Sequence, residues 1–281
     1  MKRIVRKIKG TWMTTRRKFL GALGALLVQG VVRSATSQPV PCAPGQAEQQ
    51  TSLVDDLVLA NRILANQGVL DSYGHVSARL PAPTEGYLLS RSLAPEMVRA
   101  NDLIAYNLSS QPIHPETRGQ YLERFIHGEI YHLRPDVQAI VHCHSPEVIP
   151  FGVSSVALQP LYHMAAFIGL GVPVFDIRKF AGMSDMIVRN PALGADLART
   201  LGDKPALLMR GHGAVIVGSS LRQAVGRSVY LGLNARLQMQ AIALGGKVEY
   251  LSPEESRKSG APDDYRRAWS DWKRKVGPIA P

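Results

Sequence analysis

Ala139-Ile-Val-His-Cys-His-Ser-Pro146 is an apolar strand sequence with two histidines near its end. Side chains at alternate positions of an extended strand leave the same face, so His142 and His144 are predicted to point together. A third histidine, His212, lies in a Gly-His-Gly sequence just before the apolar run 214–217. Three imidazoles that meet at one point would bind a catalytic metal and leave one coordination position open. The pattern therefore predicts a metal centre where one apolar strand ends and the other begins.

Each of these histidines alone would more often be a hydrogen-bonded core residue than a ligand. The combination is more specific, because a carboxylate, Glu123, precedes the pair, and His127 follows four residues later on the same face of a predicted helix. His127 would either orient Glu123 or cap neighbouring groups. His114 and His132 have no converging partners in the sequence and are interpreted as structural.

The apolar spacing predicts a mixture of helices and strands. Helical spacing predicts a first helix over 53–64 and a long amphipathic helix over 221–244, and 123–133 is a helix that ends before Pro135. The elements alternate without strict βαβ order. The expected fold class is therefore α/β, with helices flanking a central mixed or antiparallel sheet. Strands are expected at 74–79, 86–90, 102–107, 137–143, 172–175, 206–209 and 214–217.

The formal net charge of +11 is concentrated at the N-terminus. Residues 1–37 carry nine Lys or Arg and no acid, which leaves 24 basic against 22 acidic residues in the remainder. A net charge of +2 is ordinary for a globular domain, so the high charge is no argument for a nucleic-acid partner, and none is expected.

The N-terminal segment has the features of an export signal. Thr15-Arg-Arg-Lys-Phe-Leu20 is a twin-arginine motif, and the apolar stretch 19–32 is about 14 residues long, shorter than the roughly 20 that span a bilayer. We expect residues 1–37 to be a signal peptide removed on export to the periplasm, with only transient membrane contact. A retained amphipathic or disordered extension is the alternative. Residues 38–50 are interpreted as a linker, and 51–281 as the catalytic domain.

Cysteine usage predicts no structural disulfide. The chain has two cysteines, Cys42 in the linker and Cys143 in the strand of the predicted metal centre, and two cysteines cannot form a disulfide framework.

Several stretches together resemble the class II aldolase/adducin family over roughly residues 50–250. The resemblance implies a three-layer αβα domain, commonly a homotetramer with sites at subunit boundaries. It implies a divalent metal, usually zinc, on His142, His144 and His212, with Glu123 as the catalytic acid or base. Manganese or iron stays open, because three imidazoles do not select among these metals. The stretches are Gly74-His-Val-Ser-Ala-Arg79, Glu123 with His127, His142-Cys-His-Ser-Pro146 and Gly211-His-Gly213.

The sequence departs from the sugar-phosphate aldolases of the family. Those enzymes usually have Gly-Asn where this chain has Gly74-His75, and a Ser-Ser pair where it has Tyr121-Leu122. Both features serve the substrate phosphate, so a sugar phosphate is not the expected substrate. The chain instead resembles the decarboxylases of hydroxylated aromatic or 2-hydroxy-3-carboxymuconic semialdehyde carboxylates. Residues 89–95, 121–129, 162–165 and 174–178 carry this likeness.

The expected function is that of a metal-dependent carbon-carbon lyase, which decarboxylates a hydroxylated or oxo carboxylate through a metal-stabilised enolate. Arg91 offers a fork suited to a carboxylate, although a salt bridge is an equally good interpretation. The candidate substrate-binding residues are His75, Ser90, Arg91, Ser92 and His163.

Three alternative functions stay open. One is a class II aldolase that cleaves a hydroxy-carbonyl substrate, and another is a non-catalytic metal-binding interaction module of the adducin type. The third is a binder that uses the basic C-terminal segment 257–275. That segment also carries Tyr265, Trp269 and Trp272, whose spacing favours a helix that packs on a neighbouring subunit or covers the mouth of a site.

Overall fold

The computed structural model describes residues 44–259 and 264–277, with side chains from residue 52 onward. The predicted signal peptide and Cys42 lie outside these residues. Helix α1 (Pro44–Asn66) begins inside the predicted linker, so residues 44–50 are helical. Proline is tolerated at the first helical position, and the Gln, Ala and Glu residues at 46–50 favour a helix. Within the described ranges, no helix is long and apolar enough to cross a membrane.

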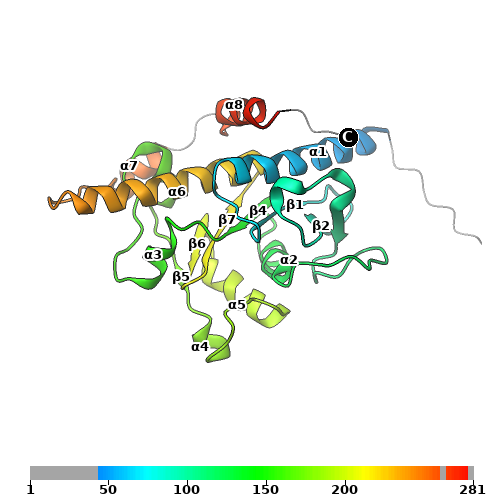
Figure 1. Cartoon of the computed structure of the whole chain (residues 1–281), viewed down its shortest axis with the longest axis horizontal. Coiled ribbons are helices and arrows are strands. Elements are labelled where there is room, and N and C mark those ends of the chain that lie inside the picture. Colours follow the sequence, from blue (N-terminus) through cyan, green and yellow to red (C-terminus); the bar gives the residue numbers. More distant parts are fainter. Residues whose placement is uncertain (1–43, 260–263, 278–281) are drawn as a thin grey trace, which may run out of the picture. The chain divides into compact units, whose positions relative to one another are not determined.

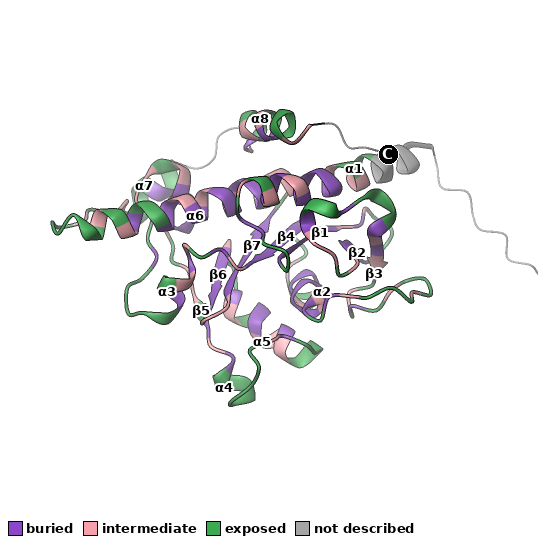
Figure 2. Cartoon of the chain, in the orientation of Figure 1, coloured by how far each residue is buried: buried purple, intermediate pink, exposed green. Residues whose placement is uncertain are grey.

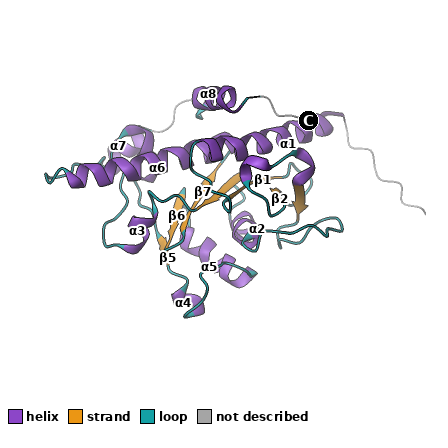
Figure 3. Ribbon diagram, in the orientation of Figure 1, coloured by secondary structure: helices purple, strands orange, loops and turns teal. Residues whose placement is uncertain are grey.

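Seven strands form one sheet in the order β3-β2-β1-β4-β7-β6-β5. Figure 3 shows the strands in orange. Neighbouring strands pair antiparallel, except β5 and β6, which are parallel. This confirms the predicted α/β class with a mixed, mainly antiparallel sheet. The strands are β1 (His75–Arg79), β2 (Tyr87–Ser90), β3 (Leu103–Tyr106), β4 (Ala139–Cys143), β5 (Val174–Phe175), β6 (Ala206–Met209) and β7 (Gly213–Gly218).

Alternation along the strands sends side chains into two separate cores. On β4, Val141 and Cys143 join the core that also contains α1, whereas Ile140 joins the core on the opposite face. The predicted division of this strand into two faces is confirmed. Strands β4, β6 and β7 are buried along their whole length (Figure 2). Each fully buried aliphatic side chain here contributes roughly 1.5–3 kcal/mol to folding.

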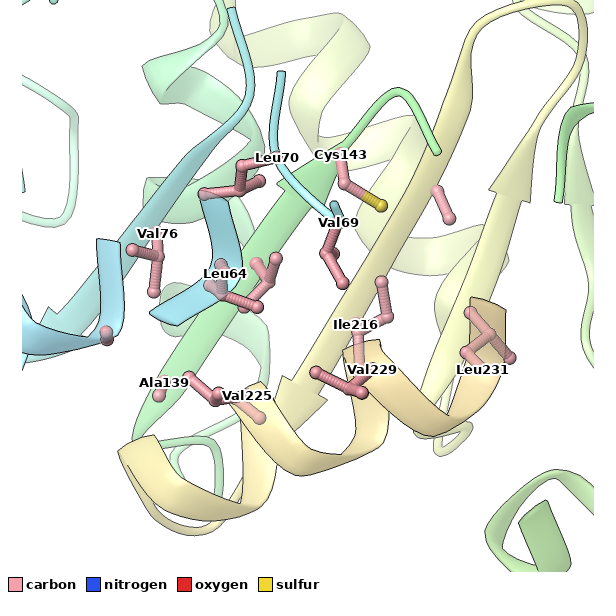
Figure 4. Packing of buried hydrophobic residues seen from close by; sticks show 14 of the residues in the cluster. Leu64, Val69, Leu70, Val76, Ala139, Cys143, Ile216, Val225, Val229 and Leu231 are labelled. Carbon is pink, nitrogen blue, oxygen red and sulfur yellow. The ribbon is translucent and has the colours of Figure 1, made fainter. Parts of the chain in front are cut away.

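Helices α1 and α6 (Leu221–Ala243) cover one face of the sheet (Figure 1). Val225 and Val229 of α6 lie against the strands beside Ile216 (Figure 4). The predicted apolar stripe of this helix is confirmed over its first half, and it ends at Leu237, which is 38% exposed. Ser220 caps α6 by accepting a hydrogen bond from the backbone N–H of Gln223.

Helices α2 (Arg124–Leu133) and α5 (Pro191–Leu201) cover the opposite face and pack on each other. Helix α2 ends before Pro135, as predicted, and α5 is capped by the Asn190 side chain, which accepts from the backbone N–H of Leu193. This second core is less purely apolar than the first. His75 and Ser77 of β1 project into it beside His142 of β4, and the candidate site is built there.

The C-terminal helix α8 (Arg266–Val276) packs on α1 and α6 of the same chain. Trp269 and Trp272 are buried there, and Gly226 leaves room on α6 for the ring of Tyr265. The prediction that this helix would pack on a neighbouring subunit or cover a site was therefore wrong. An amphipathic stripe shows that a helix needs a partner, and it does not show whether that partner belongs to the same chain.

The remaining helices are short. They are η1 (Pro95–Met97), η2 (Ala100–Asp102), α3 (Ile149–Val153), η3 (His163–Ile168), α4 (Arg178–Ala181) and α7 (Pro253–Lys258).

Candidate metal centre

The three predicted histidines and Glu123 meet at one point. One ligand atom from each of His142, His144, His212 and Glu123 lies within 4.8 Å of the others. His142 is the second-last residue of β4, His144 follows that strand, and His212 precedes β7, which pairs with β4. The convergence predicted from alternate positions on one strand and a loop before the next is confirmed.

Each histidine uses its Nδ1 atom for a hydrogen bond away from the cluster. Nδ1 of His142 lies 3.2 Å from the carbonyl oxygen of Ala214. Nδ1 of His212 lies 3.0 Å from the carbonyl oxygen of Met186. In His144, Nδ1 lies 3.1 Å from a carboxylate oxygen of Asp71. Carbonyl oxygens accept only, and so does an ionised carboxylate, so all three Nδ1 atoms carry the proton. The three Nε2 atoms therefore present lone pairs.

The Nε2 lone pairs face one another. Those of His144 and His212 are 3.2 Å apart, and the ring of His142 is 4.9 Å and 5.0 Å from the rings of His144 and His212. Nε2 of His142 is buried and has no hydrogen-bond partner. Buried nitrogen atoms of this kind are rarely left without a partner. A divalent cation shared by the three Nε2 atoms would satisfy them, so the residues present fit a metal.

Two glycines allow His212 to approach β4. Gly211 adopts a φ of +64°, which favours glycine. A Cβ atom on Gly213 would lie 1.9 Å from the carbonyl oxygen of Cys143, so only glycine fits at this crossing. Cys143 itself faces the other core as a free thiol, where burial raises its pKa to about 11. The Gly-His-Gly sequence thus has a steric role as well as supplying a ligand.

Glu123 is held at the N-terminus of α2, where the helix dipole favours a negative charge. Its Oε1 atom accepts a hydrogen bond of 3.0 Å from the backbone N–H of Val188. Its Oε2 atom lies 3.2 Å from Nε2 of His142 and 3.3 Å from Nε2 of His212. Burial alone would raise the pKa of Glu123, but positive charge at His142 and His212 lowers it well below its usual range, and a cation bound to their Nε2 atoms would act in the same direction. The carboxyl group is therefore ionised and aimed at the cluster.

Asp71 contacts the cluster through His144, although no pattern in the sequence points to it. Its Oδ1 atom accepts hydrogen bonds of 2.9 Å from the backbone N–H groups of Tyr73 and Gly74, which fixes the carboxylate in a turn. Although burial would raise the pKa of Asp71, these N–H groups and His144 lower it. Carboxylates that orient a metal-binding imidazole from behind increase the metal affinity of the site.

We expect Asp71→Asn to weaken metal binding by about 10- to 100-fold, the usual effect of losing such a partner. Asparagine can keep the turn through its side-chain oxygen but removes the charge that polarises His144. Competition with a chromogenic chelator would measure the affinity. The matched control is Asp203→Asn, because Asp203 is an exposed carboxylate paired with Lys204. Equal affinities in the two variants would show that Asp71 does not support the metal.

His75 lies beside the cluster but does not belong to its ligand set. It is the cross-strand partner of His142, and the two rings are 5.0 Å apart. Tyr121 packs on the other side of His75, with the rings 4.4 Å apart. Ser90 is buried, with its hydroxyl 3.5 Å from that of Tyr121. The structure therefore brings His75 next to the metal ligands and Ser90 behind Tyr121.

The other predicted substrate residues lie apart from the cluster. Arg91 donates from Nε to Asp102 at 2.7 Å and lines a cavity of about 420 Å³ that contains none of the four cluster residues. Ser92 is exposed, and so is His163, whose ring packs edge-on against Tyr162. Within the described chain, none of the three makes a hydrogen bond or ring contact with the cluster. Their substrate-binding roles stay predictions.

His127 makes no hydrogen bond to Glu123 or to a helix end. It hydrogen-bonds instead to His75 and to Ser77. The alternate-position rule applied to His142 and His144 would also have placed His75 and Ser77 on one face of β1. Long-range partners such as Asp71 leave no comparable local signal.

Comparisons with known proteins agree with this geometry. The family described as Class II Aldolase and Adducin N-terminal domain matches residues 55–239. The decarboxylase tropJ of Talaromyces stipitatus is 35% identical over 76% of this chain and 90% of that protein. The 3,4-dihydroxyphthalate decarboxylase of Arthrobacter keyseri is 30% identical over 69% and 81%. L-fuculose 1-phosphate aldolase of Glaciozyma antarctica shares the fold, with a TM-score of 0.69 at 22% identity over 85% and 93% of the two chains. The chain belongs to the class II aldolase/adducin family.

Proposed function

We propose that the protein is a metal-dependent carbon-carbon lyase that decarboxylates a hydroxylated or oxo carboxylate, with hydroxylated aromatic acids as the first class to test. The observation that carries this proposal is the convergence of three imidazole Nε2 atoms and one ionised carboxylate. Support for decarboxylation comes from two decarboxylases that are similar to most of this chain.

His142, His144 and His212 would hold the metal through Nε2, with zinc favoured and manganese or iron open. When bound, a divalent metal supplies positive charge that stabilises the negative charge developing on a neighbouring substrate oxygen. The chain fixes the orientation of these ligands through Ala214, Asp71 and Met186, so the lone pairs need no rearrangement on binding.

Glu123 would move the proton that the reaction requires. Because its carboxyl group starts ionised, it can take the proton of a substrate hydroxyl at Oε2. The bond to the departing carboxylate then breaks, its electron pair stays on the substrate carbon, and carbon dioxide leaves. That carbon gains the proton back from Glu123, so no external acid is needed. The backbone N–H of Val188 holds Oε1, which leaves Oε2 for the transfer.

The surroundings of His75 favour decarboxylation over cleavage of a sugar phosphate. The aldolases resembled by this chain use small polar groups at the positions of His75 and of the pair Tyr121-Leu122. Here the aromatic ring of Tyr121 packs on His75. The Tyr121 hydroxyl also donates to the carbonyl oxygen of Leu93, so this ring is fixed in place. These two side chains thus stand where the resembled aldolases have groups that serve the substrate phosphate.

The product separates the candidate reactions. Purified, metal-loaded protein would be incubated with 3,4-dihydroxyphthalate and, separately, with fuculose 1-phosphate. Release of carbon dioxide from the first without aldehyde from the second supports the proposal. Aldehyde release without carbon dioxide supports the aldolase alternative, and neither product from a metal-loaded protein supports the interaction module.

We also propose that the working form is a homotetramer with sites at subunit boundaries. Leu122, next to Glu123, is 56% exposed, and Tyr73, which follows Asp71 by two residues, is 75% exposed. Apolar side chains at the rim of a polar site are suited to cover by another subunit.

Export through the twin-arginine route is a further proposal, based on Thr15-Arg-Arg-Lys-Phe-Leu20. The double variant Arg16→Lys/Arg17→Lys keeps the charge but removes the motif. We expect it to remain in the cytoplasm at its uncleaved mass, as fractionation and mass spectrometry would show. Arg33→Lys, outside the motif, is the control and should be exported. A periplasmic fraction unchanged in the double variant would remove the signal-peptide interpretation.

A further inference from the structure

Four buried polar side chains form a chain of hydrogen bonds beside the metal centre. Nδ1 of His75 lies 2.7 Å from Nε2 of His127, and Nδ1 of His127 lies 2.6 Å from Oγ of Ser77. Oγ of Ser77 is in turn 2.8 Å from the hydroxyl oxygen of Tyr131. All four residues are at most 1% exposed. The metal-binding set uses none of them, so they need a role of their own.

The partners of these groups fix the direction in which protons are donated. Among the described residues, Ser77 is the one hydrogen-bond partner of the Tyr131 hydroxyl. If Tyr131 donates to Ser77, then Ser77 donates to Nδ1 of His127, and the proton of His127 sits on Nε2. His127 then donates to Nδ1 of His75.

The reverse order is unfavourable. If His127 carried its proton on Nδ1, it would donate to Ser77, and one hydroxyl proton of Ser77 or Tyr131 would have no acceptor. A buried hydroxyl without an acceptor is costly. The favoured order therefore leaves His75 with its proton on Nε2.

This chain of hydrogen bonds holds protons and does not conduct them. It ends at Tyr131, whose ring is covered by the guanidinium of Arg79 at 4.7 Å. Burial raises the pKa of Tyr131 well above its usual range and lowers that of His127 to about 3. Neither of these two groups therefore changes its protonation state near neutral pH. These hydrogen bonds thus resemble those that fix the tautomer of a catalytic histidine through the ring nitrogen that faces away from the substrate.

The Nε2 atom of His75 lies on the side of the ring that faces away from His127. Nδ1 is occupied by His127, so the Nε2–H group is on the opposite edge of a ring that neighbours His142. A fixed N–H group there can hydrogen-bond only to an acceptor. A donor that held the departing carboxylate would stabilise the ground state and lose its partner as carbon dioxide forms, which would slow the reaction. A useful acceptor is one that stays on the substrate.

We propose that Tyr131, Ser77 and His127 are positioning residues that lock His75 as a neutral Nε2–H donor, and that His75 binds an anionic oxygen that the substrate keeps after decarboxylation. The oxygen is that of a deprotonated hydroxyl or of a second carboxylate. This inference rests on the proposed function for the identity of the substrate. The tautomer of His75 does not depend on it.

The tautomer is tested on zinc-loaded protein with ¹⁵N-labelled histidine. Long-range proton-nitrogen spectra should show that His75 carries its proton on Nε2 in the wild type. Ser77→Ala removes the donor to His127, so His75 should become a mixture of tautomers. Tyr131→Phe removes the hydroxyl that has Ser77 as its partner, so Ser77 can then accept from His127 as well as donate to it, and a mixture is expected there too. Tyr87→Phe is the matched control, because the Tyr87 hydroxyl bonds to Ser110 and to the carbonyl oxygen of Arg124, and the wild-type tautomer should persist. A wild-type His75 protonated on Nδ1, or a Ser77→Ala variant with the wild-type tautomer, would overturn the proposal.

Ligand binding tests the role of the donor. The probes are 3,4-dihydroxybenzoate, which a dihydroxyphthalate leaves after losing one carboxylate, together with catechol and benzoate. A hydrogen bond to a charged group corresponds to about 10- to 100-fold in affinity. His75→Leu should bind 3,4-dihydroxybenzoate more weakly than the wild type by that factor. His75→Asn, which keeps an N–H donor, should recover part of the affinity.

The two simpler probes identify the oxygen. A loss confined to catechol assigns it to the hydroxyl, and a loss confined to benzoate assigns it to the carboxylate. Unchanged affinity of His75→Leu for all three probes would contradict the proposal. Failure of the proposed function is seen separately, as a protein with the expected tautomer and ligand binding that releases no carbon dioxide.

Discussion

Glu123→Gln is expected to keep the metal and the fold while lowering kcat by a factor on the order of 10² to 10⁴, the usual size of an acid-base contribution. Glutamine has the same shape and can still accept the hydrogen bond from Val188 that positions Oε1. It cannot take a proton from a substrate hydroxyl and return it to carbon. Steady-state release of carbon dioxide, measured together with metal content, would separate the loss of proton transfer from the loss of metal.

Glu129→Gln is the matched control for this variant. Glu129 also lies on α2, but it is not among the residues that converge on the cluster. We expect its kcat to remain near that of the wild type. If Glu123→Gln turns over at the wild-type rate, Glu123 has been given the wrong role, and the proton must come from another group.

The second large effect is expected from His142→Ala/His144→Ala. This variant removes two of three imidazole ligands, and one histidine with a carboxylate is a poor site for zinc. Metal content after gel filtration should fall from about one ion per subunit to nearly none. Elemental analysis of the purified protein would measure it.

His114→Ala/His132→Ala removes the same number of imidazoles from exposed positions and should keep the full metal content. This control shows whether metal is bound at one site or adheres to surface histidines. Full stoichiometry in His142→Ala/His144→Ala would mean that the cluster is not the metal site.

The sequence alone predicted the sheet and the convergence of the three histidines because both depend on local periodicity. On β4, His142 and Cys143 are adjacent and so point to opposite faces of the sheet. In the structure, Cys143 lies in the core beside α1, and His142 lies in the cluster. The loop histidine, His212, could be placed because two glycines and an apolar run mark a tight entry into a strand. Such signals lie within a few residues and do not need knowledge of the fold.

Other features of the site depend on contacts between distant segments. Asp71 reaches His144 from 73 residues away, and His127 bonds to β1 rather than to Glu123 on its own helix. Glu123 and His127 are four residues apart on one helix face, and this spacing predicted that they would interact. His127 instead forms a hydrogen bond with His75, which lies across the core. The packing of α8 on its own chain likewise could not be predicted, because the amphipathic pattern does not show which surface the apolar face contacts.

We propose that decarboxylation takes place at the metal centre formed by His142, His144, His212 and Glu123. The most direct test follows release of labelled carbon dioxide from carboxyl-¹³C dihydroxyphthalate by metal-loaded, chelator-stripped and reloaded protein, with Glu123→Gln in parallel. We predict release by the loaded protein, none after stripping, and recovery when about one equivalent of metal per subunit is restored. Glu123→Gln should bind the same equivalent and release almost nothing. Undiminished release by the stripped protein, or by a fully loaded Glu123→Gln variant, would contradict the account.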